Sequence, residues 1–410
     1  MHRSNRIEAI RRSFWVLPAV AMALGVALAL LLPAANDELG ITIGLLGLTE
    51  FSAARGLLET IATVTVSVAG ISFSITVVAL QLAAQQLGPR VLRTFQRNRL
   101  SQTVLAMFLG TFVYALVLLT QLDATATEIP HLPVAVAIVA TAVAFGLFVA
   151  FIDDTVTSLQ AATVIERIAA DGRRAIDGRH PGGAGEPVPD SEAALRDLSP
   201  SLRDREPGQV RASHGGFLVA VDGGHLVRVA ERADGVIVQR AAIGDYVLTG
   251  GLLAEIWTDG NSHDPSESAK DAFALGAERA IPQDVAFPLR QLADVALRAL
   301  SPSLNDPTTA RNAVDAAADA LVHFLRAEPI ERVRADEHGA VRLVALGAEV
   351  DDLVRVAFEE VRRAAADSPT VTAHVAKRLD EIDRVARALG VDAAEVSRQR
   401  AKLVGQDDGG

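Results

Sequence analysis

Small and hydroxyl-bearing residues recur at regular intervals along an apolar segment early in the chain. On a helix with about 100° between successive residues, one set of them falls within an arc of about 80°. This set comprises Thr60, Thr63, Ser67, Gly70, Ser74, Gln81 and Gln85. A second set lies roughly opposite and comprises Thr65, Ser72 and Thr76. A ring of such neutral polar groups can line a selective pore.

Two interpretations of these rows follow from the sequence. We predict that the first set lines a pore for ions or small solutes. The alternative is that small and hydroxyl residues only let membrane helices approach closely and bond across their contact. Thr60, Ser67, Ser74 and Gln81 are spaced by seven residues, which suits a left-handed helix crossing. The sequence leaves open which set would face a pore.

Charged groups flank this apolar segment and the last one. Arg90, Arg93 and Arg97 share one face of the turn that follows Gly88-Pro89, and we predict that they lie at anionic lipid headgroups. They serve equally well as a signal for membrane orientation. Asp153 and Asp154 end the fourth apolar segment. In an oligomer they would form an acidic ring at a cytoplasmic mouth, and otherwise they are solvated at a helix end.

The stretch SPSLNDPTTA, at residues 301–310, has the residue types of a helix start. Asn305 or Asp306 can cap the next helix, with Pro307 at its first position. The functional alternative is an anion or small ligand held at the helix N-terminus. The hydroxyls available to such a ligand belong to Ser301, Ser303, Thr308 and Thr309.

The residues of most catalytic and cofactor sites are missing. The sequence has no cysteine, which excludes disulfides, thiolate catalysis, iron–sulfur clusters and cysteine zinc sites. It has no HExxH, GxSxG, Walker or dinucleotide-binding motif. His263, Asp264 and Glu267 form the one compact metal-like group, but the ligand spacing of known sites is absent, so a solvated loop is favoured. We expect no enzyme activity, no cofactor and no metal site.

Four segments are long enough to cross a membrane, because a spanning helix needs about 20 mostly apolar residues. They cover about residues 14–32, 57–86, 104–122 and 132–152 of a predicted transmembrane domain at 1–154. Arginines gather before the first segment, between the second and third, and after the fourth. The positive-inside rule therefore places both termini in the cytoplasm. No Asp, Glu, Lys, Arg or His lies deep within a segment, which disfavours pumps and proton-coupled carriers.

The remainder of the chain predicts a soluble α+β region with a small β module and a helical bundle. We expect a connecting helix and linker at 155–208, a β-rich module at 209–260, a mainly helical domain at 261–402 and a disordered tail at 403–410. The run GDYVLTGGLLAEIW is similar to the turn of biotinyl and lipoyl domains. No lysine precedes Lys270, so this module carries no attached cofactor.

Several stretches together resemble a known family. GISFSITVVALQLAAQQLGPRVLRTF is followed in order by GTFVYALVLL, GDYVLTGGLLAEIW and DVAFPLRQLADVALRALSPSLNDPTTA. This series resembles the bacterial membrane-protein family catalogued as domain of unknown function 2254. The sequence has LGPR and SPSLNDPTTA where the family pattern has FSPR and SPGINDPFTA. The resemblance covers nearly the whole chain and implies an architecture, but no activity.

Together these features predict a homo-oligomeric protein of the bacterial inner membrane. The leading hypothesis is a channel lined by the second apolar helix and gated by the cytoplasmic domain. The alternative is a membrane-anchored scaffold or ligand sensor without transport activity. Membrane lipids are expected partners, and a small ligand or anion is expected on the cytoplasmic domain. The net charge of −11 argues against a nucleic-acid partner.

Overall fold

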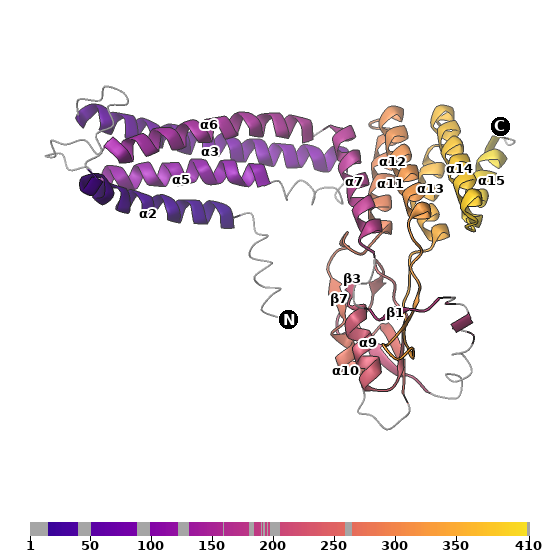
Figure 1. Ribbon diagram of the computed structural model, residues 1–410. Coiled ribbons are helices and arrows are strands. Elements are labelled where there is room, and N and C mark those ends of the chain that lie inside the picture. Colours follow the sequence, from indigo (N-terminus) through magenta and orange to yellow (C-terminus); the bar gives the residue numbers. More distant parts are fainter. Residues whose placement is uncertain are drawn as a thin grey trace. The chain divides into compact units, whose positions relative to one another are not determined.

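The computed structural model separates the chain into two compact units, Met1–Thr163 and Val164–Gly410, which are called the first and second unit below. Figure 1 shows their helices and strands, coloured along the sequence. The residues that the structure describes are 15–39, 51–87, 99–121, 131–158, 160–179, 184–189, 191, 193–194, 196, 206–258 and 265–407.

The first unit consists of long apolar helices, as predicted. They are α2 (Val16–Leu39), α3 (Phe51–Leu87), α5 (Arg99–Gln121) and α6 (His131–Ser158). All four are long and apolar enough to cross a membrane, with mean hydropathies between 2.0 and 2.7. Helix α3 has 37 residues. At 1.5 Å per residue it is about 56 Å long, well beyond the hydrocarbon thickness of about 30 Å.

Helix α5 is the centre of the first unit, since α2, α3 and α6 all pack against it. Two polar side chains tie it to its neighbours. The Tyr114 hydroxyl donates to the Pro133 carbonyl at 2.8 Å, and the Gln121 amide donates to the Ala29 carbonyl at 2.8 Å. Phe108 meets the rings of Phe145 and Phe148 edge-on. These contacts fix α5 against α2 and α6.

Glycines allow α2 and α5 to approach at backbone distance. A Cβ added to Gly25 would lie 2.5 Å from the Gly110 carbonyl oxygen, and one added to Gly110 would lie 3.0 Å from the Ala21 carbonyl oxygen. Small residues of this kind drive helix packing in lipid, where apolar burial gives no advantage over lipid tails.

The second unit contains two sheets, in which β4 and β9 pair in parallel and every other recorded pair is antiparallel. The larger sheet has the order β1 (Glu186–Pro187), β8 (Val333–Ala335), β9 (Val341–Val344), β4 (Val236–Gln239), β6 (Leu252–Trp257) and β2 (Gly208–Arg211). The smaller has the order β5 (Tyr246–Val247), β3 (Gly216–Val221) and β7 (Phe273–Gly276). Two helices accompany them, α9 (Gly223–Arg232) and α10 (Ser266–Lys270).

The sheets therefore use more of the chain than the predicted β-rich module at 209–260. Strand β1 precedes that module and β7 follows it, while β8 and β9 come from between two helices of the bundle. A local pattern can indicate a strand, but it does not show which distant strand it pairs with.

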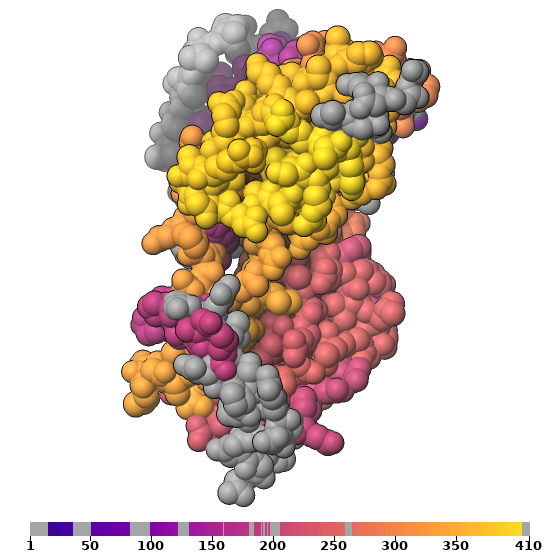
Figure 2. Space-filling view, turned by 90° about the vertical axis from the view of Figure 1, so that its right-hand side faces the viewer, coloured from indigo at the N-terminus to yellow at the C-terminus, as the bar shows by residue number. Residues whose placement is uncertain are grey.

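The other helices are α7 (Ala161–Asp177), most of which lies in the second unit, and α11 (Ala286–Ala299), α12 (Pro307–Arg326), α13 (Val350–Ala364), α14 (Pro369–Leu389) and α15 (Ala394–Asp407). Figure 2 shows the C-terminal helices, in yellow, gathered apart from the β-rich part, in pink. Helix α15 runs into residues 403–410, the segment predicted to be a disordered tail.

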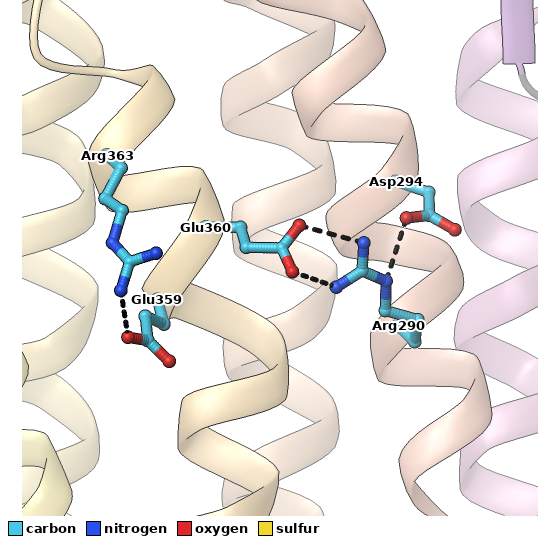
Figure 3. Close-up of polar contacts among 5 residues, drawn as sticks. All are labelled: Arg290, Asp294, Glu359, Glu360 and Arg363. Carbon is cyan, nitrogen blue, oxygen red and sulfur yellow. Dashed lines mark hydrogen bonds and ion pairs between the residues drawn. The ribbon is translucent and has the colours of Figure 1, made fainter. Parts of the chain in front are cut away.

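An ion pair joins α11 to α13 (Figure 3). Arg290 binds Glu360 through two guanidinium nitrogens, at 2.6 and 2.9 Å, and its Nε binds Asp294 of its own helix at 2.9 Å. The bond to Glu360 is the main reason that the pKa of Arg290 lies above its ordinary value. Glu359, which precedes Glu360 in α13, instead pairs with Arg363 one turn along the same helix.

We predict that Gly110→Leu destabilises the first unit, because the new side chain collides with the α2 backbone. The expected loss is about 1–3 kcal/mol, measured as a lower melting temperature of the detergent-solubilised chain. Gly146→Leu is the matched control, since nothing lies within 4 Å of a Cβ there. Equal melting of the two variants would refute the close approach of α2 and α5.

We predict that Glu360→Gln destabilises the chain more than Glu359→Gln does. Glu360 is about half exposed, so removing its charge from the contact between helices costs about 1 kcal/mol. The pair within α13 contributes only about 0.3–0.5 kcal/mol. Thermal unfolding of both variants at low salt measures the difference. A larger loss from Glu359→Gln would contradict the role given to Arg290.

Candidate functional site

The first set of small and polar residues lies on the exposed face of α3. Thr60, Thr63, Ser67, Gly70, Ser74 and Gln81 are all exposed in the isolated chain. The side chain of Gln85 lies outside the described residues. These positions run along the part of α3 that is able to cross a membrane, Phe51–Leu82. The chain therefore presents a polar row outward at membrane depth.

The second set faces the other helices of the first unit. Thr65 is 0% exposed and Ser72 is 3% exposed, while Thr76 is half-buried. This face of α3 packs against α5 and α6. The structure thus separates two rows that the sequence could not rank: the second contributes to packing within one chain, and only the first is available to anything outside it.

Most of the hydroxyls in the exposed row donate to their own helix. Thr60 donates to the Gly56 carbonyl at 2.8 Å, and Ser67 donates to the Thr63 carbonyl at 2.7 Å. Thr63 does the same to the Glu59 carbonyl at 2.9 Å. A hydroxyl whose proton is used in this way keeps its oxygen lone pairs. The row therefore presents mainly hydrogen-bond acceptors to its surroundings.

Apolar side chains border the exposed row. Val66 and Phe73 are 41% and 46% exposed on one flank, and Ile71 is 53% exposed on the other. Val78 falls within the arc itself, between Ser74 and Gln81, and is 60% exposed. Near the N-terminal end of the row, Glu59 is paired with Arg55 at 3.1 Å. The row is a narrow polar strip on an otherwise lipid-compatible surface.

Of the two charged groups predicted to flank the apolar segments, the structure describes only the acidic one. Asp153 is exposed and Asp154 is half-buried near the end of α6. An acidic ring requires several copies of the chain, so the structure of one chain shows only that Asp153 is accessible. Arg90, Arg93 and Arg97 lie outside the described residues.

In the turn before α12, the structure identifies Asp306 as the helix cap. One carboxylate oxygen accepts from the Thr308 and Thr309 amides at 3.1 and 3.0 Å, and the other accepts from the Thr309 hydroxyl at 2.6 Å. The Thr309 hydrogen bonds hold the pKa of Asp306 below its ordinary value. Asn305 adopts a left-handed conformation with φ of 45°. An external anion would have to displace the Asp306 carboxylate from these amides.

Two of the stretches that carry the family resemblance meet at an ion pair whose carboxylate, that of Asp284, is buried. Arg279 binds Asp284 through two bonds of 2.7 Å, and Asp284 also accepts from the Phe287 amide in the first turn of α11. Gly244, of the GDYVLTGG turn, faces this pair with φ of +95°. A Cβ there would lie 2.7 Å from both an Arg279 nitrogen and an Asp284 oxygen. Sequence analysis did not single out Arg279 or Asp284, since no spacing rule links them to Gly244.

Sequence analysis also missed one group of possible metal ligands. Glu231, Asp336 and His338 bring their ligand atoms within 4.8 Å of one another. They come from segments about a hundred residues apart, so no spacing pattern reveals them. Of the group that the sequence suggested, His263 and Asp264 lie outside the described residues, and Glu267 pairs with Lys270 at 2.8 Å.

Comparison with known proteins agrees with this architecture. The family described as "Predicted membrane protein (DUF2254)" matches residues 11–381. The uncharacterized proteins Rv1290c of Mycobacterium tuberculosis and Mb1321c of Mycobacterium bovis are each 30% identical to the chain over 320 residues. The matched part covers 75% of this chain but only 60% of each relative, so the chain spans less than two thirds of their length. No solved structure matches the chain. The chain belongs to the DUF2254 family of membrane proteins, with four helices able to cross the bilayer.

Proposed function

We propose that copies of this chain assemble in the bacterial inner membrane into a channel for ions or small solutes. The exposed row of α3 lines the pore, and the second unit, in the cytoplasm, gates it. The observation that carries this proposal is the polar row on the face of α3 that none of the described helices covers.

The polar groups on that face need surroundings that satisfy their hydrogen bonds. A polar group that lacks a partner in hydrocarbon is expensive, and an amide such as that of Gln81 has both donors and acceptors to satisfy. Turning the row toward a shared axis gives these groups water, while Val66, Phe73 and Ile71 remain available to lipid or to neighbouring copies. Outward-facing oxygen lone pairs favour water and cations as the permeating species.

The connection between the units supports the gating role. Helix α7 begins at Ala161, directly after α6 ends at Ser158. Within the second unit its C-terminal part is tied to α12. Arg173 binds Asp319 at 3.0 Å, and Asp177 binds His323 at 2.8 Å. A rearrangement of the helices around α12 would therefore act on the chain segment that leads into α6.

The second candidate function is a membrane-anchored scaffold or ligand sensor. The hydrogen bonds of Thr60, Thr63 and Ser67 to their own helix favour it, because these hydroxyls need no water. In this case the row is a contact between the α3 helices of two copies, where small residues allow close approach. The two functions make opposite predictions about water at the row.

Cysteine substitution distinguishes them, since the chain has no cysteine of its own. We predict that Ser67→Cys and Ser74→Cys react with a membrane-impermeant thiosulfonate, because the attacking thiolate forms only where water reaches the thiol. Val66→Cys and Phe73→Cys are the matched controls, at the same depth and similarly exposed in the chain. They should stay unlabelled.

Three results would count against the pore. Disulfide cross-linking at Ser67→Cys and Ser74→Cys without labelling would support the scaffold. No labelling and no cross-linking would place the row in lipid. Equal labelling of all four positions would show that water access does not follow the polar row.

A further inference from the structure

The group formed by Glu231, Asp336 and His338 lies in the β-rich part of the second unit. Glu231 belongs to the last turn of α9, Asp336 directly follows β8, and His338 lies in the turn between β8 and β9. Their ligand atoms lie within 4.8 Å of one another. A carboxylate pair and an imidazole at this separation are within reach of a single ion after small side-chain adjustments.

Asp336 is held in place as an ionised carboxylate. Its side chain is 3% exposed, and one oxygen accepts from the amides of His338 and Ala340, both at 2.9 Å. The other oxygen accepts from Arg342 Nε at 2.7 Å. Metal-binding carboxylates are commonly oriented by outer hydrogen bonds of this kind.

The charges around Asp336 do not balance. Arg342 also binds Asp234 at 2.9 Å, so one guanidinium already serves two carboxylates. Glu231 adds a third, which leaves this group with three negative charges and one positive charge. Among the described residues, no hydrogen bond or ion pair is recorded for the Glu231 carboxylate or the His338 ring. The Arg342 guanidinium offsets one of these negative charges, and a divalent ion near the carboxylates would neutralise the remaining two.

We propose that Glu231, Asp336 and His338 bind one divalent transition-metal ion, for which Zn²⁺ is the best fit. An imidazole ligand favours Zn²⁺ over Mg²⁺ or Ca²⁺, which prefer oxygen alone. Three protein ligands leave the fourth position of a tetrahedral Zn²⁺ site for water. The ion would tie the turn between β8 and β9 to α9, and so join segments that are distant in sequence. This site is independent of the proposed channel.

The test is isothermal titration of the purified full chain with Zn²⁺, in detergent and without a histidine tag. We expect one saturable site per chain. Glu231→Gln and His338→Ala should each weaken binding by about tenfold or more. Both residues are exposed, so the variants should fold, and circular dichroism checks this. Zn²⁺ should also raise the melting temperature of the wild type but not of His338→Ala.

His214→Ala is the control, because it removes an exposed histidine of the same β-rich part outside the group. It should bind Zn²⁺ as the wild type does. Wild-type affinity in both Glu231→Gln and His338→Ala would overturn the proposal, as would the absence of saturable Zn²⁺ binding to the wild type. Affinity lost in His214→Ala alone would place the ion elsewhere.

Discussion

Hydrocarbon offers no hydrogen-bond partner, and this constrains every polar group in the first unit. The backbone amides and carbonyls form their hydrogen bonds within each helix. The hydroxyls of Thr60, Thr63 and Ser67 donate to carbonyls one turn back in α3. The Tyr114 hydroxyl donates to the Pro133 carbonyl of α6. The helix arrangement follows, since α5 makes its contacts with neighbours on several sides while one face of α3 stays open.

The open face of α3 is the feature of the first unit that points to a function. A helix that is exposed only to lipid needs no polar row, and a helix buried within one chain has no open face. Helix α3 has both a row buried within the chain and a row exposed outside it. The exposed row is therefore available to a second copy or to water. In a pore around a shared axis, the row would contact both neighbouring copies and water.

The second unit follows different rules, because water surrounds it in the proposed arrangement. Its stability comes from pairing over long sequence separations. Strands β8 and β9 leave the helical bundle between α12 and α13 and complete a sheet that begins much earlier in the chain, with β1 at Glu186. The Arg279–Asp284 pair joins the β-rich part to the start of α11. The sheet and the bundle are thus interleaved along the chain rather than placed one after the other.

The sequence predicts the features that depend on local patterns and misses those that depend on contacts between distant segments. Apolar length and helical periodicity are local, so the four long helices, α12 with its cap, and the two rows on α3 follow from the sequence. The assignment of Thr65 and Ser72 to the packed face required the positions of α5 and α6. The strands β1 and β8, the contact of Gly244 with Asp284, and the group around Asp336 depend on long-range pairing, for which a single sequence carries no signal.

The central claim is that the exposed row of α3 borders a conducting path. Planar-bilayer recording of the purified, reconstituted chain tests it most directly, with Ser67→Leu/Ser74→Leu beside the matched Val66→Leu/Phe73→Leu control. The account predicts unitary currents that are reduced or abolished by the first pair and unchanged by the second. Silence of the folded, oligomeric wild type across salts, pH and voltage would contradict it, as would currents that the Ser67→Leu/Ser74→Leu variant leaves unaltered.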